Sequence, residues 1–235
     1  RVFSTLDATS GYYQLELEER AKEKTAFSWK GGHFEFNRMA FGLCNAPSTF
    51  QRAMDTILRE EIDKFAISYL DDIIIYSKDI ETHKKHLETV FMKLKEAGIF
   101  LNKKKCKLGK QKVKILGNVV SEGQVRPDSE KIECIKTYPL PTTVKELRSF
   151  LGLLNYCREF IKNFAQKAKP LFDLLKGETK RSVRKIIHTI ESKQAFIKLR
   201  EEITEKQRGH SLILTENLYL QPMHQSMESE LFWDR

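Results

Sequence analysis

The sequence predicts an α+β protein, in which an antiparallel sheet backed by two helices is followed by a mainly α-helical region. Through the first half of the chain, apolar strand-like segments alternate with amphipathic helical segments. Their order is strand, helix, strand, strand, helix, strand, which is that of a split βαβ sheet. After Pro127 the apolar spacing becomes helical and the charge becomes basic. We therefore expect two parts of different architecture.

The strands are predicted from short apolar runs. Residues 1–6 are expected to form a strand that leads to Asp7, and residues 25–36 contain two strand-like segments joined at Gly31-Gly32. A glycine pair between such segments is a strong hairpin signal. Residues 65–77 form the most apolar stretch and are interrupted only by one pair of acids, so we expect two buried strands there.

Two helices are predicted from apolar residues that recur on one face. The first begins near Asn45, which can cap it, and Pro47 suits its first turn. The second ends at Gly98, and strand character returns at residues 113–120. The apolar faces consist of Phe50, Met54, Ile57 and Leu58 in the first helix and of Leu87, Val90, Phe91, Leu94 and Ala97 in the second.

The expected boundaries follow from this pattern. We expect the sheet domain at residues 1–122 and the helical region at residues 123–204, where Thr143-x-x-Glu146 is a capping box that opens a helix. Periodicity fades beyond this point, so residues 205–235 receive no assignment of secondary structure. Because the first residues are strand-like and no methionine precedes them, we expect the chain to be a piece of a longer polypeptide.

Composition bounds the class of protein. Lys and Arg exceed Asp and Glu by 41 to 32, and residues 93–114 contain nine lysines with Glu96 as their single acid. Such a run is either a solvated face or a nucleic-acid contact, and the two remain open on charge alone. No run approaches the roughly 18 apolar residues of a membrane span. The four cysteines form no CxxC pair. We expect an intracellular protein with no membrane partner.

Three carboxylates are the candidate catalytic residues. Asp71-Asp72 lies between two apolar strands, where it is either a solvent-facing turn or a buried site. Asp7 ends another apolar strand, and Ser10-Gly11 then permits a tight turn. In a split βαβ sheet that strand lies beside the central hairpin. Three carboxylates at one sheet edge suit Mg²⁺, and two such ions about 3.5–4 Å apart can activate a hydroxyl and stabilise a leaving pyrophosphate.

Five segments then resemble one family in their order and spacing. They are FSTLDATSGYYQ, FGLCNAPSTFQRAM, YLDDIIIYS, the lysine-rich segment and ILGNVVSEG. In these segments the chain resembles reverse transcriptases of gypsy-type LTR retrotransposons, and the resemblance runs from residue 1 to about residue 200. The resemblance implies a polymerase palm at residues 1–122, with the fingers largely missing before it. It implies a helical thumb or connection at residues 123–204.

The resemblance assigns the metal ligands. Asp7 and Asp71 look like the two residues that bridge the metals, Asp72 looks like a supporting carboxylate, and the carbonyl of Ala8 is a further ligand. The implied cofactor is a pair of Mg²⁺ ions, with Mn²⁺ as a possible substitute. Lys105 matches the lysine that protonates pyrophosphate, although Lys103 and Lys104 beside it remain alternatives.

The resemblance also implies a nucleotide site. Its expected residues are Ser10, Gly11, Tyr12, Phe41 and Gly42. Tyr12 matches the bulky residue under the incoming sugar, where a ring would clash with a 2′-hydroxyl. On sequence alone, an ordinary strand aromatic is the better interpretation of Tyr12. Gly42 would let the backbone approach the nascent base pair closely.

The expected partners are an RNA or DNA template with its primer strand, and dNTPs. Tyr69, Leu116 and Gly117 match segments that contact primer and template, and the basic helices from residue 143 onward would follow the duplex backbone by charge and shape. The resemblance places the protein in the cytoplasm within retroelement particles. Its oligomeric state is not predicted.

The leading hypothesis is an RNA-directed and DNA-directed DNA polymerase fragment that transfers a nucleotide from dNTP to a primer 3′-hydroxyl. The alternative is an inactive relic that retains only nucleic-acid binding, and a nucleotide cyclase on a related palm is a third. The missing fingers and the altered tail favour the relic, whereas Ala40, which stands where relatives carry proline, is a minor change. In the tail, Glu216 replaces an expected aspartate in LILTENLYLQ, so we expect residues 205–235 to be a degenerate or truncated ribonuclease H start without activity.

Overall fold

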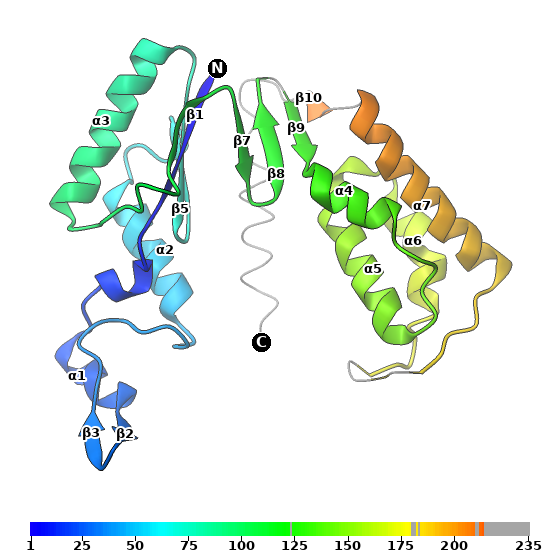
Figure 1. Ribbon diagram of the computed structural model, residues 1–235, viewed down its shortest axis with the longest axis horizontal. Coiled ribbons are helices and arrows are strands. Elements are labelled where there is room, and N and C mark those ends of the chain that lie inside the picture. The colour runs from blue at the N-terminus through cyan, green and yellow to red at the C-terminus, as the bar shows by residue number, and fades with distance from the viewer. Residues whose placement is uncertain (123, 180–181, 183, 210–211, 214–235) are drawn as a thin grey trace. The chain divides into compact units, whose positions relative to one another are not determined.

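A computed structural model describes residues 1–122, 124–179, 182, 184–209 and 212–213 (Figure 1). The fold is mixed α and β, so the predicted α+β class is confirmed. The chain separates into two compact units, one containing Arg1–Val113 and the other the described residues of Lys114–Thr215.

A four-stranded antiparallel sheet organises the first unit. Its strands are β1 (Val2–Asp7), β4 (Ala66–Tyr69), β5 (Asp72–Ser77) and β6 (Lys107–Lys110). Their spatial order is β4-β5-β1-β6, so β5 lies between β1 and β4. This is the split βαβ order, because β1 reaches β4 through a helix and β5 then inserts between them.

Two helices cover one face of this sheet (Figure 1). They are α2 (Ala46–Ile57), with proline in its first turn, and α3 (Ile80–Glu96), whose Asp79 side chain caps the Thr82 amide at 2.8 Å. Apolar side chains at helical spacing meet alternate residues of the strands. The resulting core contains Leu6, Phe50, Met54, Leu58, Ile73, Ile75, Val90 and Leu94. Phe91, expected on the apolar face of α3, is exposed instead.

A small hairpin and short helices connect β1 to α2. The 3₁₀ helix η1 (Gly11–Gln14) follows β1, and α1 (Glu19–Lys22) and η2 (Glu23–Thr25) precede the hairpin of β2 (Phe27–Trp29) and β3 (Gly32–Phe34). Trp29 pairs with Gly32, so the turn is Lys30-Gly31 rather than the predicted Gly31-Gly32. Lys30 adopts a left-handed conformation with φ 49°, which shifts the turn by one residue.

The second sheet has the order β10-β9-β8-β7. Its strands are β7 (Lys112–Ile115), β8 (Asn118–Ser121), β9 (Gln124–Pro127) and β10 (Leu212–Ile213). The prediction of a single strand at residues 113–120 that completes the first sheet is therefore wrong. That segment is a hairpin of the second sheet, and the fully exposed β6 completes the first.

Four helices make up most of the second unit. They are α4 (Ser129–Lys136), α5 (Val144–Tyr156), α6 (Phe164–Asp173) and α7 (Ile190–Gly209), with the 3₁₀ helix η3 (Arg158–Phe160) between α5 and α6. The predicted capping box of Thr143 and Glu146 is present at the start of α5. Within the described part of the chain, no helix combines the length and apolar character needed to cross a bilayer. The segment around Glu216 lies outside the described residues.

Candidate active site

The site is built at one end of the β1–β5 pair. Asp7 and Asp72 are directly opposite in this register, and residues so paired have Cα atoms about 4.5–5.5 Å apart. Side chains alternate between the two faces of a strand, and Leu6 and Ile73 face the helices. Asp7 and Asp72 therefore point to the opposite face of the sheet, close enough to share a ligand.

Asp71 lies in the two-residue turn that joins β4 to β5. Leu70, the other turn residue, has a left-handed backbone with φ 49°, which is unfavourable for a leucine. Gln51 of α2 supports it, since its side-chain oxygen accepts from the Leu70 amide at 2.7 Å. The Asp71 carbonyl accepts from the Ala8 amide at 2.9 Å. The turn is thus held from α2 on one side and from the end of β1 on the other.

One carboxylate oxygen of Asp71 is buried and has no hydrogen-bond partner within the described protein. A side-chain carbon at Gly11 would collide with this oxygen and lie 2.7 Å from Phe50 Cζ. Only glycine therefore fits beside Asp71. A buried, unpaired carboxylate oxygen is costly, so this group is suited to a ligand that supplies what the protein does not.

The electrostatics of the site favour a bound cation. Loss of solvent contact raises the pKa of Asp71, and the charges of Asp7 and Asp72 raise it further, against a smaller opposing effect of Lys105. Desolvation by the surrounding protein raises the pKa of Asp72, and the negative charge of Asp7 raises it further. Part of the Asp72 side chain is nevertheless exposed to solvent. Like charges held together at low solvation are stabilised by a positive group between them.

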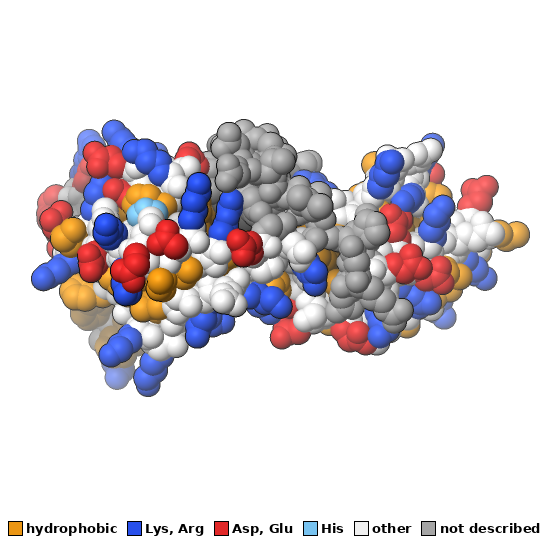
Figure 2. Space-filling view, turned by 90° about the horizontal axis from the view of Figure 1, so that it is seen from above, with side chains coloured by type: hydrophobic (Ala, Val, Ile, Leu, Met, Phe, Trp, Pro, Cys, Tyr) orange, Lys and Arg blue, Asp and Glu red, His pale blue; other side chains and the backbone are white. Residues whose placement is uncertain are grey.

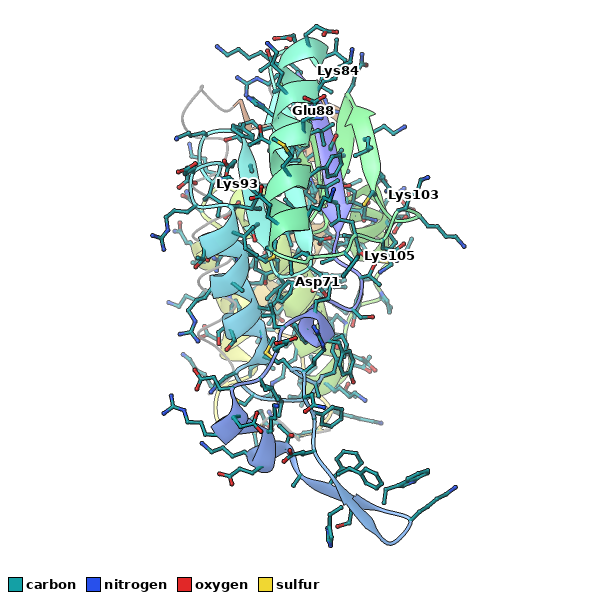
Figure 3. The ribbon with its side chains drawn as sticks, turned by 90° about the vertical axis from the view of Figure 1, so that its left-hand side faces the viewer. Asp71, Lys84, Glu88, Lys93, Lys103 and Lys105 are labelled. Carbon is teal, nitrogen blue, oxygen red and sulfur yellow. The ribbon has the colours of Figure 1, made fainter. Side chains whose placement is uncertain are left out.

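Lys105 supplies one such positive group. Its Nζ lies 3.2 Å from Asp7 Oδ2, and the lysine side chain is 65% exposed. Figure 3 shows Lys105 near Asp71 and Lys103 further out. The geometry therefore distinguishes Lys105 from its two lysine neighbours, which the sequence left equivalent.

The chemistry of the donor set fits a hard divalent cation, since it offers carboxylate oxygens with one oxygen unpaired. In the described portion of the chain, however, no three His, Cys, Asp or Glu side chains are grouped so that they could hold a metal ion. One carboxylate oxygen of Asp7 is instead paired with the ammonium of Lys105. A single ion held by three of these carboxylates would therefore need their side chains to reorient.

The expected nucleotide residues lie beside Asp71. Ser10 is left-handed with φ 48° and precedes η1, which carries Gly11 and Tyr12. The Tyr12 ring lies between those of Phe41 and Phe50, with centroids at 4.9 Å and 5.6 Å. Desolvation and then the charge of Asp71 raise the pKa of Tyr12. Tyr12 is therefore a half-buried wall of the site rather than an ordinary strand residue.

Two of these residues are open to solvent. Phe41 is 55% exposed and is followed by Gly42, which has a φ of 93° that would be strained for a residue with a side chain.

The residues expected to contact primer and template lie in both units. Tyr69 ends β4 directly opposite Asp72. Leu116 and Gly117 belong to the second unit, where they form the turn between β7 and β8 with φ values of 45° and 74°.

Sequence reasoning missed two supporting residues, Gln51 and His83. The buried His83 of α3 lies 2.6 Å from the Ser4 hydroxyl of β1 and 2.8 Å from the Ser77 hydroxyl of β5. It thus links the helix to both strands that carry acids. The sequence does hold one indication that His83 is buried, because it shares a helical face with the apolar residues Leu87 and Val90.

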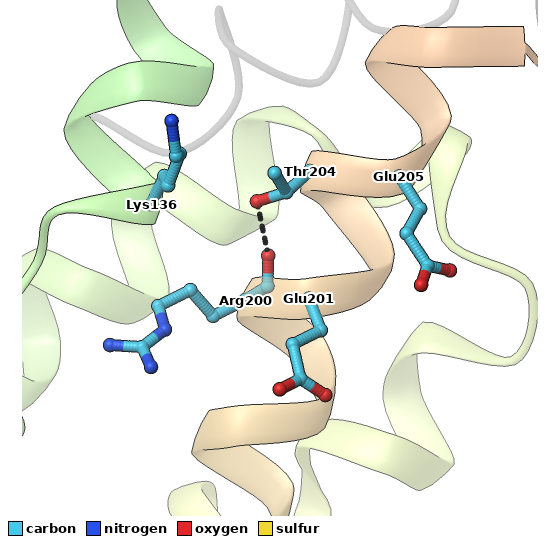
Figure 4. A pocket seen from close by; sticks show the side chains of 5 residues that line it. All are labelled: Lys136, Arg200, Glu201, Thr204 and Glu205. Carbon is cyan, nitrogen blue, oxygen red and sulfur yellow. Dashed lines mark hydrogen bonds between the residues drawn. The ribbon is translucent and has the colours of Figure 1, made fainter.

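A pocket of about 310 Å³ in the second unit is separate from all of these residues (Figure 4). The Thr204 hydroxyl donates to the Arg200 carbonyl there at 2.7 Å. Its mixture of cations and carboxylates favours no single ligand charge. The lining residues are Lys136, Arg200, Glu201, Thr204 and Glu205.

Comparison with known proteins decides the family. Residues 1–120 match the family described as reverse transcriptase (RNA-dependent DNA polymerase). The chain belongs to the reverse transcriptase family. This reverse transcriptase is 44% identical over 198 residues to the retrovirus-related Pol polyprotein from transposon 297 of Drosophila melanogaster, covering 84% of the chain and 18% of that protein. It is 47% identical over 178 residues to that from transposon gypsy of the same fly, covering 76% and 17%.

The predicted resemblance to retrotransposon reverse transcriptases is therefore confirmed. The chain spans less than a fifth of the length of these relatives. Among solved structures, the foamy viral protease-reverse transcriptase in complex with double-stranded DNA is similar with a TM-score of 0.77 and 29% identity, covering 87% of this reverse transcriptase and 35% of that chain. The same viral protein in complex with an RNA/DNA hybrid gives 0.76 and 29%, covering 86% and 27%.

Proposed function

We propose that this chain is the palm and thumb of a retroelement RNA- and DNA-directed DNA polymerase, which adds a nucleotide from dNTP to a primer 3′-hydroxyl. The observation that carries the proposal is the cross-strand pairing of Asp7 with Asp72, with Asp71 in the adjoining turn. A bond forms between the primer oxygen and the α-phosphorus, and the bond from that phosphorus to pyrophosphate breaks. The hydroxyl proton passes to water.

Asp7, Asp71, Asp72 and the Ala8 carbonyl would hold two Mg²⁺ ions, for which Mn²⁺ could substitute. When bound, such ions lower the pKa of the attacking hydroxyl and neutralise the departing pyrophosphate. The unpaired oxygen of Asp71 and the raised pKa values of Asp71 and Asp72 support this assignment. Protonation of these acids would compete with the cation.

Other residues of the first unit would orient the nucleotide. Lys105, which is paired with Asp7 in this structure, would donate a proton from its ammonium to pyrophosphate. The Tyr12 ring blocks the space of a ribose 2′-hydroxyl, which favours deoxynucleotides. Ser10 and Gly11 bring the backbone close to the sugar and triphosphate, and Phe41 with Gly42 would pack against the new base pair.

Residues of each unit would contact primer or template. Tyr69 stands beside the acids, while the Leu116-Gly117 turn would contact the primer strand. The lysines of residues 103–112 and the basic helices of the second unit would contact phosphates without reading sequence. The relatives solved with double-stranded DNA and with an RNA/DNA hybrid support this choice of partner.

A second candidate is a protein that binds nucleic acid without polymerising it. It is favoured by one observation, namely that within the described residues the acids are not grouped as a formed metal site. Lys105 paired with Asp7 would then be a permanent structural ion pair.

Primer extension with Mg²⁺ separates the two candidates. The chain, its Asp71→Asn variant and an Asp173→Asn control are compared on one labelled primer–template. Asp173 makes a surface ion pair with Lys176, so the control applies the same chemical change away from the acids. We expect Asp71→Asn to reduce extension by roughly two orders of magnitude or more, with the control unchanged. Binding of the duplex without extension by any of the three proteins would favour the second candidate.

A further inference from the structure

The Leu116-Gly117 turn of the second unit is held in an unusual backbone conformation. Both residues are left-handed, with φ values of 45° and 74°. Glycine adopts this conformation freely, but leucine does so only when its surroundings compensate. The turn therefore depends on contacts made by neighbouring elements.

Those contacts engage both turn carbonyls. The Tyr156 hydroxyl, at the last residue of α5, donates to the Leu116 carbonyl. The Asp128 amide, at the cap of α4, donates to the Gly117 carbonyl at 3.1 Å. Asp128 also forms an ion pair with Lys114 of β7, so the strand before the turn is tied to the same cap.

The Tyr156 ring is itself fixed. Lys131 of α4 places its Nζ 3.1 Å from the ring centroid, a cation–π contact. A side-chain carbon at Gly117 would collide with the Tyr156 hydroxyl and lie 2.8 Å from Lys131 Nζ. Gly117 is therefore required both by its backbone conformation and by the approach of this tyrosine and lysine.

We propose that Tyr156 is a positioning residue, braced by Lys131, that locks the Leu116-Gly117 turn to helices α4 and α5. A primer strand held by the turn is then held by the helical unit as a whole. The inference rests on the proposed function, in which the turn contacts the primer. It concerns retention of primer–template and not the chemical step, since Tyr156 lies in the second unit and the three acids lie in the first.

The test is Tyr156→Phe in the full chain, which removes the hydroxyl and keeps the ring. Tyr138→Phe is the matched control, because the Tyr138 hydroxyl also donates to a backbone carbonyl, that of Glu146 at 3.1 Å, away from the turn. We expect Tyr156→Phe to raise the primer–template Kd, measured by fluorescence anisotropy, roughly three- to tenfold. The KM for primer–template should rise in parallel. The KM for dNTP and the single-turnover rate with saturating primer–template should stay within about twofold.

Lys131→Gln provides a second variant, and we expect it to weaken primer–template binding in the same direction by a smaller factor. Equal Kd values for Tyr156→Phe and Tyr138→Phe would overturn the inference. So would a loss confined to the single-turnover rate. The binding measurement needs no turnover, so the absence of extension by the unmodified chain would refute the proposed polymerase while the anisotropy result still decides the role of Tyr156.

Discussion

At the scale of single residues, Asp71 shows how the site is maintained at a cost to the fold. Its buried oxygen lacks a partner within the described protein, and its pKa is raised by desolvation and by neighbouring acids. An acid whose pKa is higher in the folded state destabilises the fold once it ionises. Stability is thus lost as the pH rises from the ordinary aspartate value through the raised one. Active sites commonly show such a trade between stability and function.

Replacing Asp71 by Asn should therefore stabilise the metal-free protein at neutral pH. We expect a rise in melting temperature on the order of 2 °C near pH 7 without divalent ions. The difference should vanish only well below the ordinary aspartate pKa of about 3.9, where Asp71 is protonated in both the folded and the unfolded chain. Thermal unfolding monitored by circular dichroism measures it. A variant less stable than the parent at neutral pH would contradict the proposed strain at Asp71.

Lys105 and Lys103 are exposed lysines of the same segment, so the same substitution can be compared at both positions. Lys105 contacts Asp7 at 3.2 Å, whereas Lys103 lies further than Lys105 from Asp71 in the view of Figure 3. We expect Lys105→Met to slow single-turnover primer extension by about tenfold or more, because the substitution removes the proposed proton donor to pyrophosphate. Lys103→Met should change the rate by less than about twofold. Equal effects of the two substitutions would remove the special role of Lys105.

At the scale of elements, the strands that carry the acids are fastened to α3 by a buried polar cluster. His83 contacts Ser4 of β1 and Ser77 of β5, and the Ser4 hydroxyl also accepts from the Gly109 amide of β6 at 3.0 Å. Desolvation and then the nearby His86 lower the pKa of His83. The neutral form of this histidine is therefore the one that the fold accommodates.

This cluster should make stability depend on pH. Because the pKa of His83 is lower in the folded than in the unfolded chain, the unfolded state binds the extra proton first as the pH falls. We expect the urea midpoint to fall as the pH decreases below about 6.5, the unfolded value. His83→Gln should flatten that slope. His33→Gln is the control, since His33 is exposed and its ring is hydrogen-bonded to the Ser28 hydroxyl in a separate hairpin. A slope that both variants share with the parent would contradict the role of His83.

Element prediction succeeded where apolar spacing was strong and failed where it was absent. The periodic residues Phe50 and Met54 marked α2, and the interrupted apolar run marked β4 and β5. The strand β6 was missed because all four of its residues are exposed at the sheet edge, where charged residues discourage pairing with other chains. The turn at Lys30-Gly31 was misplaced because lysine rarely takes a left-handed conformation.

The candidate site was predictable to a similar degree. Asp7, Asp71 and Asp72 stood out as acids at the ends of apolar strands, and their pairing follows from the strand order. Gln51 and His83 could not be assigned a role, because each acts through a contact across many residues of sequence that only the packed fold brings together.

At the scale of the whole molecule, the net charge of +9 is spread over many groups. Figure 2 shows Lys and Arg side chains interspersed with Asp and Glu on the face drawn. Several lysines are engaged in ion pairs, including Lys93 with Glu61 and Lys114 with Asp128. Only part of the positive charge is therefore available to phosphates.

Primer–template binding should consequently weaken with salt, but less steeply than for a strongly basic protein. We expect the affinity to fall about 10- to 1,000-fold between roughly 50 and 200 mM monovalent salt, with a linear logarithmic plot. Anisotropy titrations without divalent ions measure the slope, and Asp71→Asn should leave it unchanged. Affinity that does not respond to salt would contradict the proposed phosphate contacts.

Because a side chain at Gly11 would collide with its neighbours, this position can be used to compare copies of a retroelement. Retroelements decay by random substitution, and most of their changes say little about whether a copy still works. Codon 11 is different, since every replacement there drives atoms into Asp71 and Phe50. Copies that have lost this glycine are therefore expected to carry a displaced Asp71 or Phe50 side chain, even when all three acids are still encoded.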